Sequence, residues 1–113
     1  MDMNQFTQKA QEAIQAAQVK ALRYSQQEVD GEHVLLALVE DVEGLTPRLL
    51  ERLGVSVPTL KARLEEELDR RPRVTGGGTE AGKVLVTHRL NKLLITAADE
   101  AKRLKDEYVS VEH

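Results

Sequence analysis

The sequence predicts an all-α fold, a pseudo-twofold bundle of two homologous helical repeats in which the second repeat is truncated. Residues 84–113 repeat residues 4–33 without a gap, at a constant offset of 80. Chance gives about two identities over such a stretch. This stretch has the identical pairs Thr7/Thr87, Ala17/Ala97, Ala21/Ala101, Arg23/Arg103, Val29/Val109, Glu32/Glu112 and His33/His113. An internal repeat of this kind decides the architecture before other patterns do.

Two features of the composition support the same fold class. Phe6, Tyr24 and Tyr108 are the aromatic residues of the chain, so its core must consist of Leu, Val, Ile and Ala. That choice favours helices over a β-sandwich. With 113 residues, of which 41% are hydrophobic and 31% charged, the chain is long enough for one globular domain but not for an added catalytic unit.

Charge and cysteine content exclude several classes of function. The net charge of -3 gives no electrostatic reason to expect nucleic acid or an anionic membrane as a partner. The absence of cysteine excludes disulfides, thiolate metal sites and a cysteine nucleophile. No export signal or membrane-spanning window is visible, so we expect a cytoplasmic protein.

The first two helices are predicted from apolar spacing and from one capping residue. Apolar residues of the segment 5–24 recur at the spacing of one face of a helix. Asp30 is a natural N-cap, because its carboxylate can accept the free amide groups of the next turn. The run 33–39 that follows is apolar on nearly every side, so this second helix should be the most deeply buried.

Proline, glycine and serine residues mark the next two helices. Thr46 and Pro47 indicate the N-cap and first residue of a third helix, which ends at Gly54. Ser56 and the following proline open a fourth helix. Its apolar stripe is formed by Leu60, Leu64 and Leu68.

A glycine-rich linker should join the two repeats. We place repeat one at 4–71, the linker at 72–83 and the first part of repeat two at 84–113. A helix resumes from Thr87, and Ser110 corresponds to Asp30 as the cap of a further helix that the sequence only begins.

Because the counterpart of the second helix is missing, the apolar face around Leu90, Leu94 and Ala98 should be partly uncovered. Exposed apolar patches promote association. The domain is therefore expected to be a monomer or to associate weakly.

No pattern in the chain predicts catalysis, a cofactor or a metal. The segment 77–84 approaches a phosphate-binding loop, but Val84 replaces the hydroxyl that holds Mg²⁺ and Glu80 places a negative charge in the anion cradle. Adjacent Glu-His pairs at 32–33 and 112–113 point about 100° apart on a helix and cannot share one metal. We expect a non-catalytic binding module with no cofactor of its own.

Five motifs occur along the chain: FTQKA at 6–10, DGEHVLLAL at 30–38, DVEG at 41–44, LLERLGV at 49–55 and YVSVEH at 108–113. Together they resemble the N-terminal domain of the Clp ATPases, and its ClpB-type disaggregase branch in particular. The segment 71–74, followed by the glycine-rich linker, is more similar to the ClpB branch than to the protease-coupled ClpC branch.

The resemblance implies a substrate-recognition domain of two four-helix repeats, tethered to two ATPase rings in another part of the protein. It implies that the domain binds unfolded or aggregated polypeptide and assists its delivery to the pore of a hexamer. ATP and Mg are expected only in the ATPase domains, and a Hsp70-type co-chaperone would act through the full-length protein. The alternatives are an adaptor-docking domain of a ClpC/ClpA-type unfoldase and a free-standing double-repeat protein.

By the same resemblance, the substrate-binding residues fall on Thr7, Asp106 and Glu112. The residue after the glutamate is leucine in some members and His113 here. Each residue also has a purely structural interpretation. Thr7 could only start a helix, Asp106 could be a solvated loop acid, and Glu112 could only complement a helix dipole.

Overall fold

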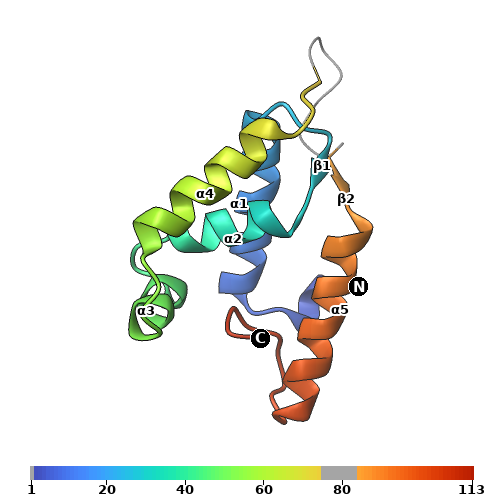
Figure 1. Ribbon diagram of the computed structural model, residues 1–113. Helices are drawn as coiled ribbons and strands as arrows, with labels where there is room; N and C mark the ends of the chain where they lie inside the picture. The colour runs from blue at the N-terminus through green and yellow to red at the C-terminus, as the bar shows by residue number, and fades with distance from the viewer. Residues whose placement is uncertain (1, 75–83) are drawn as a thin grey trace.

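The computed structural model describes residues 2–74 and 84–113, and helices dominate this part of the chain (Figure 1). Residues 75–83 of the expected linker, with most of the phosphate-loop-like segment, lie outside the described residues. The elements in order are the 3-10 helix η1 (Met3–Gln5), α1 (Gln8–Arg23), β1 (Glu28–Val29), α2 (Gly31–Glu40), α3 (Leu45–Arg52), α4 (Val57–Arg70), β2 (Leu85–Val86) and α5 (His88–Arg103). The predicted all-α class is confirmed, apart from one short sheet.

Capping residues set the helix starts. Thr7 Oγ1 accepts the Ala10 N–H at 3.2 Å, and Thr87 Oγ1 accepts the Leu90 N–H at 3.0 Å. Asp30 caps α2 and Ser56 caps α4, as the sequence predicts.

The predicted start of α3 is wrong by two residues. This helix begins at Leu45 with Gly44 as its N-cap, so Pro47 lies inside the first turn. Proline is tolerated there because first-turn amide groups have no partner within the helix. The predicted end is confirmed, since Gly54 follows the helix with a φ of 81°, which suits glycine.

A short parallel sheet, absent from the sequence prediction, joins the two repeats. In it, Glu28 pairs with Leu85 and Val29 with Val86. A second parallel bridge joins Phe6 to Val109, at positions 80 residues from Val86 and Val29 respectively. In each repeat, the segment before the first helix therefore pairs with an extended segment of the other repeat. Such a reciprocal exchange is what an approximate twofold axis requires.

Local conformations also repeat at the offset of 80. Ser25 and Lys105, which follow α1 and α5, both have a left-handed backbone, with φ of 55° and 61°. The next residues donate N–H groups back into the preceding helix, Gln26 to Ala21 O at 2.9 Å and Asp106 to Ala101 O at 2.8 Å. The repeat seen in the sequence is thus a repeat of backbone geometry, whereas the exact boundaries of the repeats and linker stay predictions.

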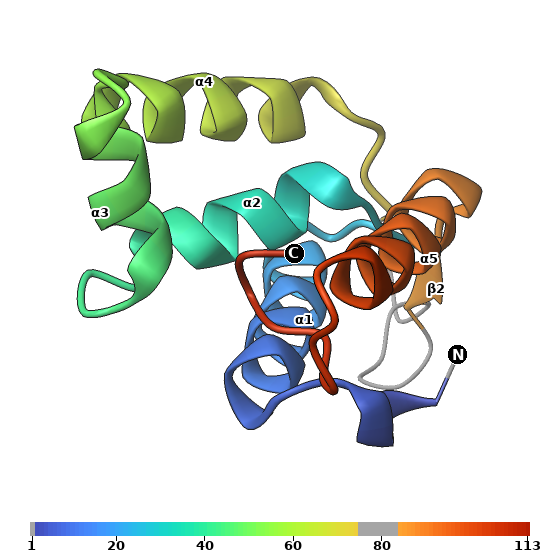
Figure 2. The same cartoon turned by 90° about the horizontal axis from the view of Figure 1, so that it is seen from below.

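The helices form layers around aliphatic clusters. Figure 2 shows α4, α2 and α1 as successive layers, with α5 beside them. Leu36 and Val39 of α2 are buried against Leu64 and Leu68 of α4. Between the repeats the core is formed by Phe6, Ala10, Ala97, Ala101 and Val109. The predicted stripe of α4 and the deep burial of α2 are both supported by this packing.

The predicted uncovered face of α5 is partly wrong. Leu90 is only 1% exposed, because the parallel sheet brings Val29 against it beside Ala17 and Ala21. Leu94 and Ala98 are half-buried. The large apolar residues of α5 that remain exposed are Leu93 and Ile95, at 47% and 48%.

The buried carboxylate of Asp30, at the start of α2, binds residues of both repeats. Asp30 Oδ1 accepts the Thr87 hydroxyl at 2.8 Å, and Oδ2 accepts Arg71 at 3.2 Å and Arg89 at 3.1 Å. Burial alone would raise the pKa of Asp30, but the Gly31 N–H, the Thr87 hydroxyl and the two arginines outweigh it and hold the pKa below its usual value.

A buried histidine continues this network into α4. His33 Nδ1 accepts the Asp30 N–H at 2.9 Å, so the neutral ring carries its proton on Nε2, which donates to Gln26 Oε1 at 2.7 Å. The Gln26 amide then donates to Leu68 O at 2.7 Å. Burial lowers the pKa of His33, and Arg71 lowers it further, against the opposing charges of Asp30 and Glu32.

We predict that Asp30→Asn destabilises the protein by about 2 kcal/mol, because the substitution keeps the N-cap but removes the charge that pairs with two arginines. Urea unfolding followed by circular dichroism measures this change. The control is Glu100→Gln, which alters an exposed acid paired with Arg103 and should change stability little. Equal changes in the two variants would contradict the importance of the buried network.

We also predict that the free energy of unfolding decreases as the pH falls below about 6.5, the value for an unperturbed histidine. The lowered pKa of folded His33 means that the unfolded chain binds the proton first. The full contribution of His33 to stability is therefore present above the pKa that the histidine has in the unfolded chain. Below that value the free energy of unfolding decreases by up to about 1.4 kcal/mol per pH unit, until the pKa of folded His33 is reached. Urea unfolding at several pH values between 7.5 and 5.5 measures this dependence. The free energy of unfolding should change less with pH in His33→Gln than in the parent, and an equal pH dependence in both would contradict the role of His33.

Candidate functional site

The segment Val109–His113 lies between α1 and α5 and closes an apolar hollow. The Thr7 N–H donates to Val109 O at 2.9 Å, and the Val109 N–H donates to Gln5 O at 2.8 Å, so main-chain bonds fix the start of the segment. The hollow has a volume of about 90 Å³. It is lined by Phe6, Ala10, Ala13, Ile14, Val34, Leu38, Leu93, Leu94, Ala97, Val109, Ser110, Val111 and His113. We call it the apolar hollow.

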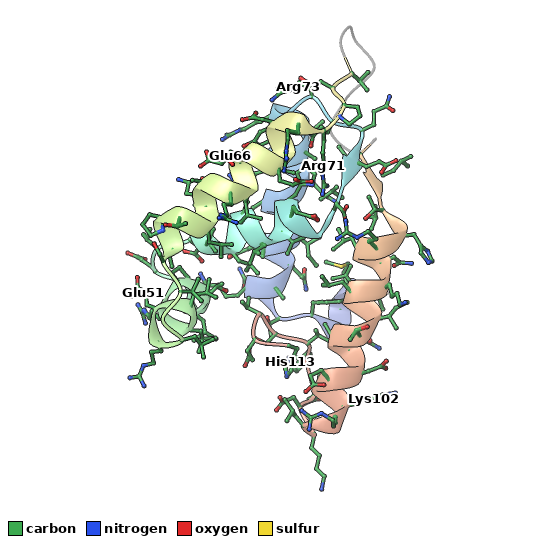
Figure 3. All side chains as sticks on the ribbon, in the orientation of Figure 1. Glu51, Glu66, Arg71, Arg73, Lys102 and His113 are labelled. Carbon is green, nitrogen blue, oxygen red and sulfur yellow. The ribbon has the colours of Figure 1, made fainter. Side chains whose placement is uncertain are left out.

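His113 ties the end of this segment to Asp106. The ring Nδ1 accepts the Ser110 N–H at 2.9 Å, and Nε2 contacts Asp106 Oδ2 at 2.7 Å. The His113 side chain is 1% exposed, whereas that of Asp106 is 50% exposed. A buried ring therefore holds a carboxylate that faces solvent, and Figure 3 shows His113 near the lower end of α5.

Glu112 points into a separate and larger cleft. The Ser110 hydroxyl lowers the pKa of the Glu112 carboxyl, and its own backbone N–H lowers it further. Its cleft of about 490 Å³ has a floor of small and aliphatic residues from α1 and α2. The charged residues around it are Lys9, Glu12, Asp41, Glu43 and Glu112. We call it the acidic cleft.

Thr7 has a clear structural role in addition to any functional one. Its Oγ1 caps α1 and its backbone N–H holds Val109. The hydroxyl hydrogen is not used in the cap, so the half-buried Thr7 side chain can still donate one hydrogen bond.

The structure brings the three predicted residues around one segment but not into one hollow. Asp106 and Glu112 are connected through His113, and Thr7 is joined by its main chain to Val109. Glu112 lines the acidic cleft, Asp106 lines a recess of about 230 Å³, and Thr7 lines neither of them. They form the border of a surface and not the lining of a single pocket.

The sequence did not predict which apolar residues line the site, apart from Leu94 on the face expected to be partly uncovered. Phe6 and Val111 line the apolar hollow together with Leu38 of α2. Their apolar character was the available signal, but it does not distinguish a core position from a groove position. His113 in place of leucine leaves the hollow largely apolar, because its polar atoms are occupied by Ser110 and Asp106.

Among residues 2–74 and 84–113, no group of three or more His, Cys, Asp or Glu side chains could hold a metal ion. No helix in this part of the chain is long and apolar enough to cross a membrane.

Curated relatives match the whole chain. The chain is 50% identical over 113 residues to "Chaperone protein ClpB" of Nitratidesulfovibrio vulgaris, and 47% identical over 113 residues to the protein of the same name in Bacillus cereus. In both cases the match covers 100% of this chain and 13% of the relative. The chain thus spans about an eighth of the length of these proteins.

Solved structures share the fold at lower sequence identity. The N-terminal domain of the ClpV1 ATPase from Escherichia coli matches with a TM-score of 0.82 and 23% identity, over 95% of this chain and 63% of that chain. The Hsp104 N-terminal domain from Candida albicans matches with a TM-score of 0.78 and 18% identity, over 93% and 67%. A structure described as "Peptide from EAEC T6SS Sci1 SciI protein" matches with a TM-score of 0.84 and 23% identity, over 98% and 68%.

The family assignment rests on both the fold and the sequence. The sequence profile of the Clp repeat (R) N-terminal domain matches residues 5–113. The duplicated caps, turns and bridges provide the physical basis of that match, because they fix the positions that the two repeats share. The chain belongs to the family of Clp repeat N-terminal domains.

Proposed function

We propose that this chain is the substrate-recognition N-terminal domain of a ClpB-like disaggregase, and that it binds unfolded or aggregated polypeptide without catalysing a reaction itself. The observation that carries the proposal is the apolar hollow together with its two neighbouring carboxylates. His113 of the hollow contacts Asp106, and Val111 of the hollow also lines the cleft of Glu112. The identity of 50% to a protein named as a ClpB chaperone supports the branch. The peptide in the description of one structural neighbour supports the kind of ligand.

The chemistry of unfolded chains fits this surface. Such chains share exposed apolar side chains and free main-chain groups, but no common sequence. The apolar hollow can receive one aliphatic side chain. The carboxylates of Asp106 and Glu112 can accept main-chain N–H groups beside it, and the Thr7 hydroxyl can donate to a carbonyl.

The whole protein would add the chemistry that this domain lacks. We propose that ATP and Mg bind only in ATPase domains elsewhere in the protein, that the full-length protein is a hexamer, and that it works in the cytoplasm with a Hsp70-type partner. The domain would then collect clients and assist their delivery to the ATPase rings.

The alternative is adaptor docking, as expected for a ClpC/ClpA-type unfoldase. The outward face of α3 favours it, because Leu45, Leu49 and Leu53 are exposed at helical spacing. A folded partner could cover such a stripe. Pull-down from a lysate with the α3 variant Leu49→Asp distinguishes the two, since loss of one discrete partner supports docking and an unchanged broad set of unfolded proteins supports client binding.

We predict that the triple variant Thr7→Ala, Asp106→Ala, Glu112→Ala binds an unfolded polypeptide about tenfold more weakly than the parent. That loss corresponds to about 1.4 kcal/mol, roughly the net contribution of one or two hydrogen bonds. Fluorescence anisotropy with labelled, reduced and carboxymethylated α-lactalbumin measures the affinity.

The matched control changes one threonine and two glutamates on α3 and α4, as Thr59→Ala, Glu51→Ala, Glu66→Ala. Figure 3 shows Glu51 and Glu66 on the side of the molecule away from His113. This control should bind as the parent does. Because Thr7→Ala also removes a helix cap, thermal melting must confirm that both variants are folded at the assay temperature. Equal affinities of the two triple variants would show that the site is misplaced.

A further inference from the structure

The duplicated turn provides an internal comparison for the candidate site. The rings of His33 and His113 each accept a main-chain N–H at Nδ1, at 2.9 Å in both repeats. Each ring then uses Nε2 at 2.7 Å to reach the side chain seven residues earlier, Gln26 in one repeat and Asp106 in the other. We call each series of hydrogen bonds, from the main-chain N–H through the ring to the side chain, a relay. The two relays have the same geometry and differ in the group at which they end.

Because of that difference in chemistry, the first relay continues to another protein group, whereas the second ends at solvent. Gln26 is 4% exposed, and its amide nitrogen passes a hydrogen bond on to Leu68 of α4. A carboxylate has no donor to pass on. Within the part of the chain that the structure describes, Asp106 Oδ1 accepts no hydrogen bond, and half of the side chain is exposed. The second relay therefore ends at an oriented acceptor that faces solvent.

We propose that His113 is a positioning residue of the polypeptide-binding surface, holding Asp106 so that Oδ1 accepts a main-chain N–H of the bound chain. The inference rests on the proposed function. A carboxylate fixed in advance loses less rotamer freedom when the ligand binds, so it contributes more to affinity than a free one. The same ring holds the Ser110 N–H and thereby fixes the turn that carries Glu112.

The test compares His113→Leu and His113→Gln with the parent. Leucine fills a similar volume but makes neither hydrogen bond. Glutamine at this position of the turn can accept the Ser110 N–H and still donate an N–H to Asp106, in the manner of a capping box. His88→Gln is the control, because His88 is an exposed histidine at the start of α5.

The probe is labelled, reduced and carboxymethylated α-lactalbumin, with anisotropy measured at pH 7.5. His113→Leu should bind about five- to tenfold more weakly than the parent, as expected for loss of a charge-assisted hydrogen bond that orients the acceptor, and His113→Gln should restore most of the affinity. His88→Gln should bind as the parent does.

Two results would overturn the inference while leaving the proposed function intact. One is a folded His113→Leu variant that binds as the parent does. The other is a folded His113→Gln variant that binds as weakly as His113→Leu does. If the parent binds no unfolded polypeptide, the proposed function itself fails. If His113→Leu does not fold, His113→Asn replaces it in the comparison, because its shorter amide cannot span from the Ser110 N–H to Asp106.

Discussion

The fold depends on the exchange of short extended segments between the two repeats. The Thr87 N–H donates to Val29 O at 3.1 Å, and the Thr7 N–H donates to Val109 O at 2.9 Å. These amide groups lie at helix starts, where the helix itself offers no acceptor. Each repeat therefore needs the other to satisfy its backbone, and this mutual need sets α1 beside α5. The same exchange places the segment after Val109 against α1, which creates the candidate site.

The two repeats share this scaffold but differ in the position of an aspartate. In repeat one the acid is Asp30, at the N-cap, buried and surrounded by arginines, and Gln26 ends the relay as a neutral amide. In repeat two Ser110 stands at the position that Asp30 has in repeat one, and the acid is Asp106, exposed at the end of the relay. A buried, paired acid stabilises a structure, whereas an exposed, oriented acid is available to a ligand. Function is therefore expected where the copies differ.

The sequence predicted what depends on local chemistry and on the repeat. Helices, the caps at Asp30 and Ser56 and the stop at Gly54 follow from short patterns. Two-residue strands are too short to show a period, so β1 and β2 were missed, and with them the burial of Leu90. For the site, the family resemblance indicated Thr7, Asp106 and Glu112, but only tertiary contacts show that His113 contacts Asp106 and that Asp106 and Glu112 line separate clefts.

The dimensions of the site also limit how tightly it can bind. A hollow of about 90 Å³ holds one aliphatic side chain, whose burial contributes about 2 kcal/mol. A few hydrogen bonds at its border contribute about 1 kcal/mol each. The loss of translational freedom and the ordering of a flexible client oppose these terms with several kcal/mol. The expected affinity is therefore weak. Weak binding fits the proposed function, because a surface that held an unfolded chain tightly would compete with the delivery of that chain.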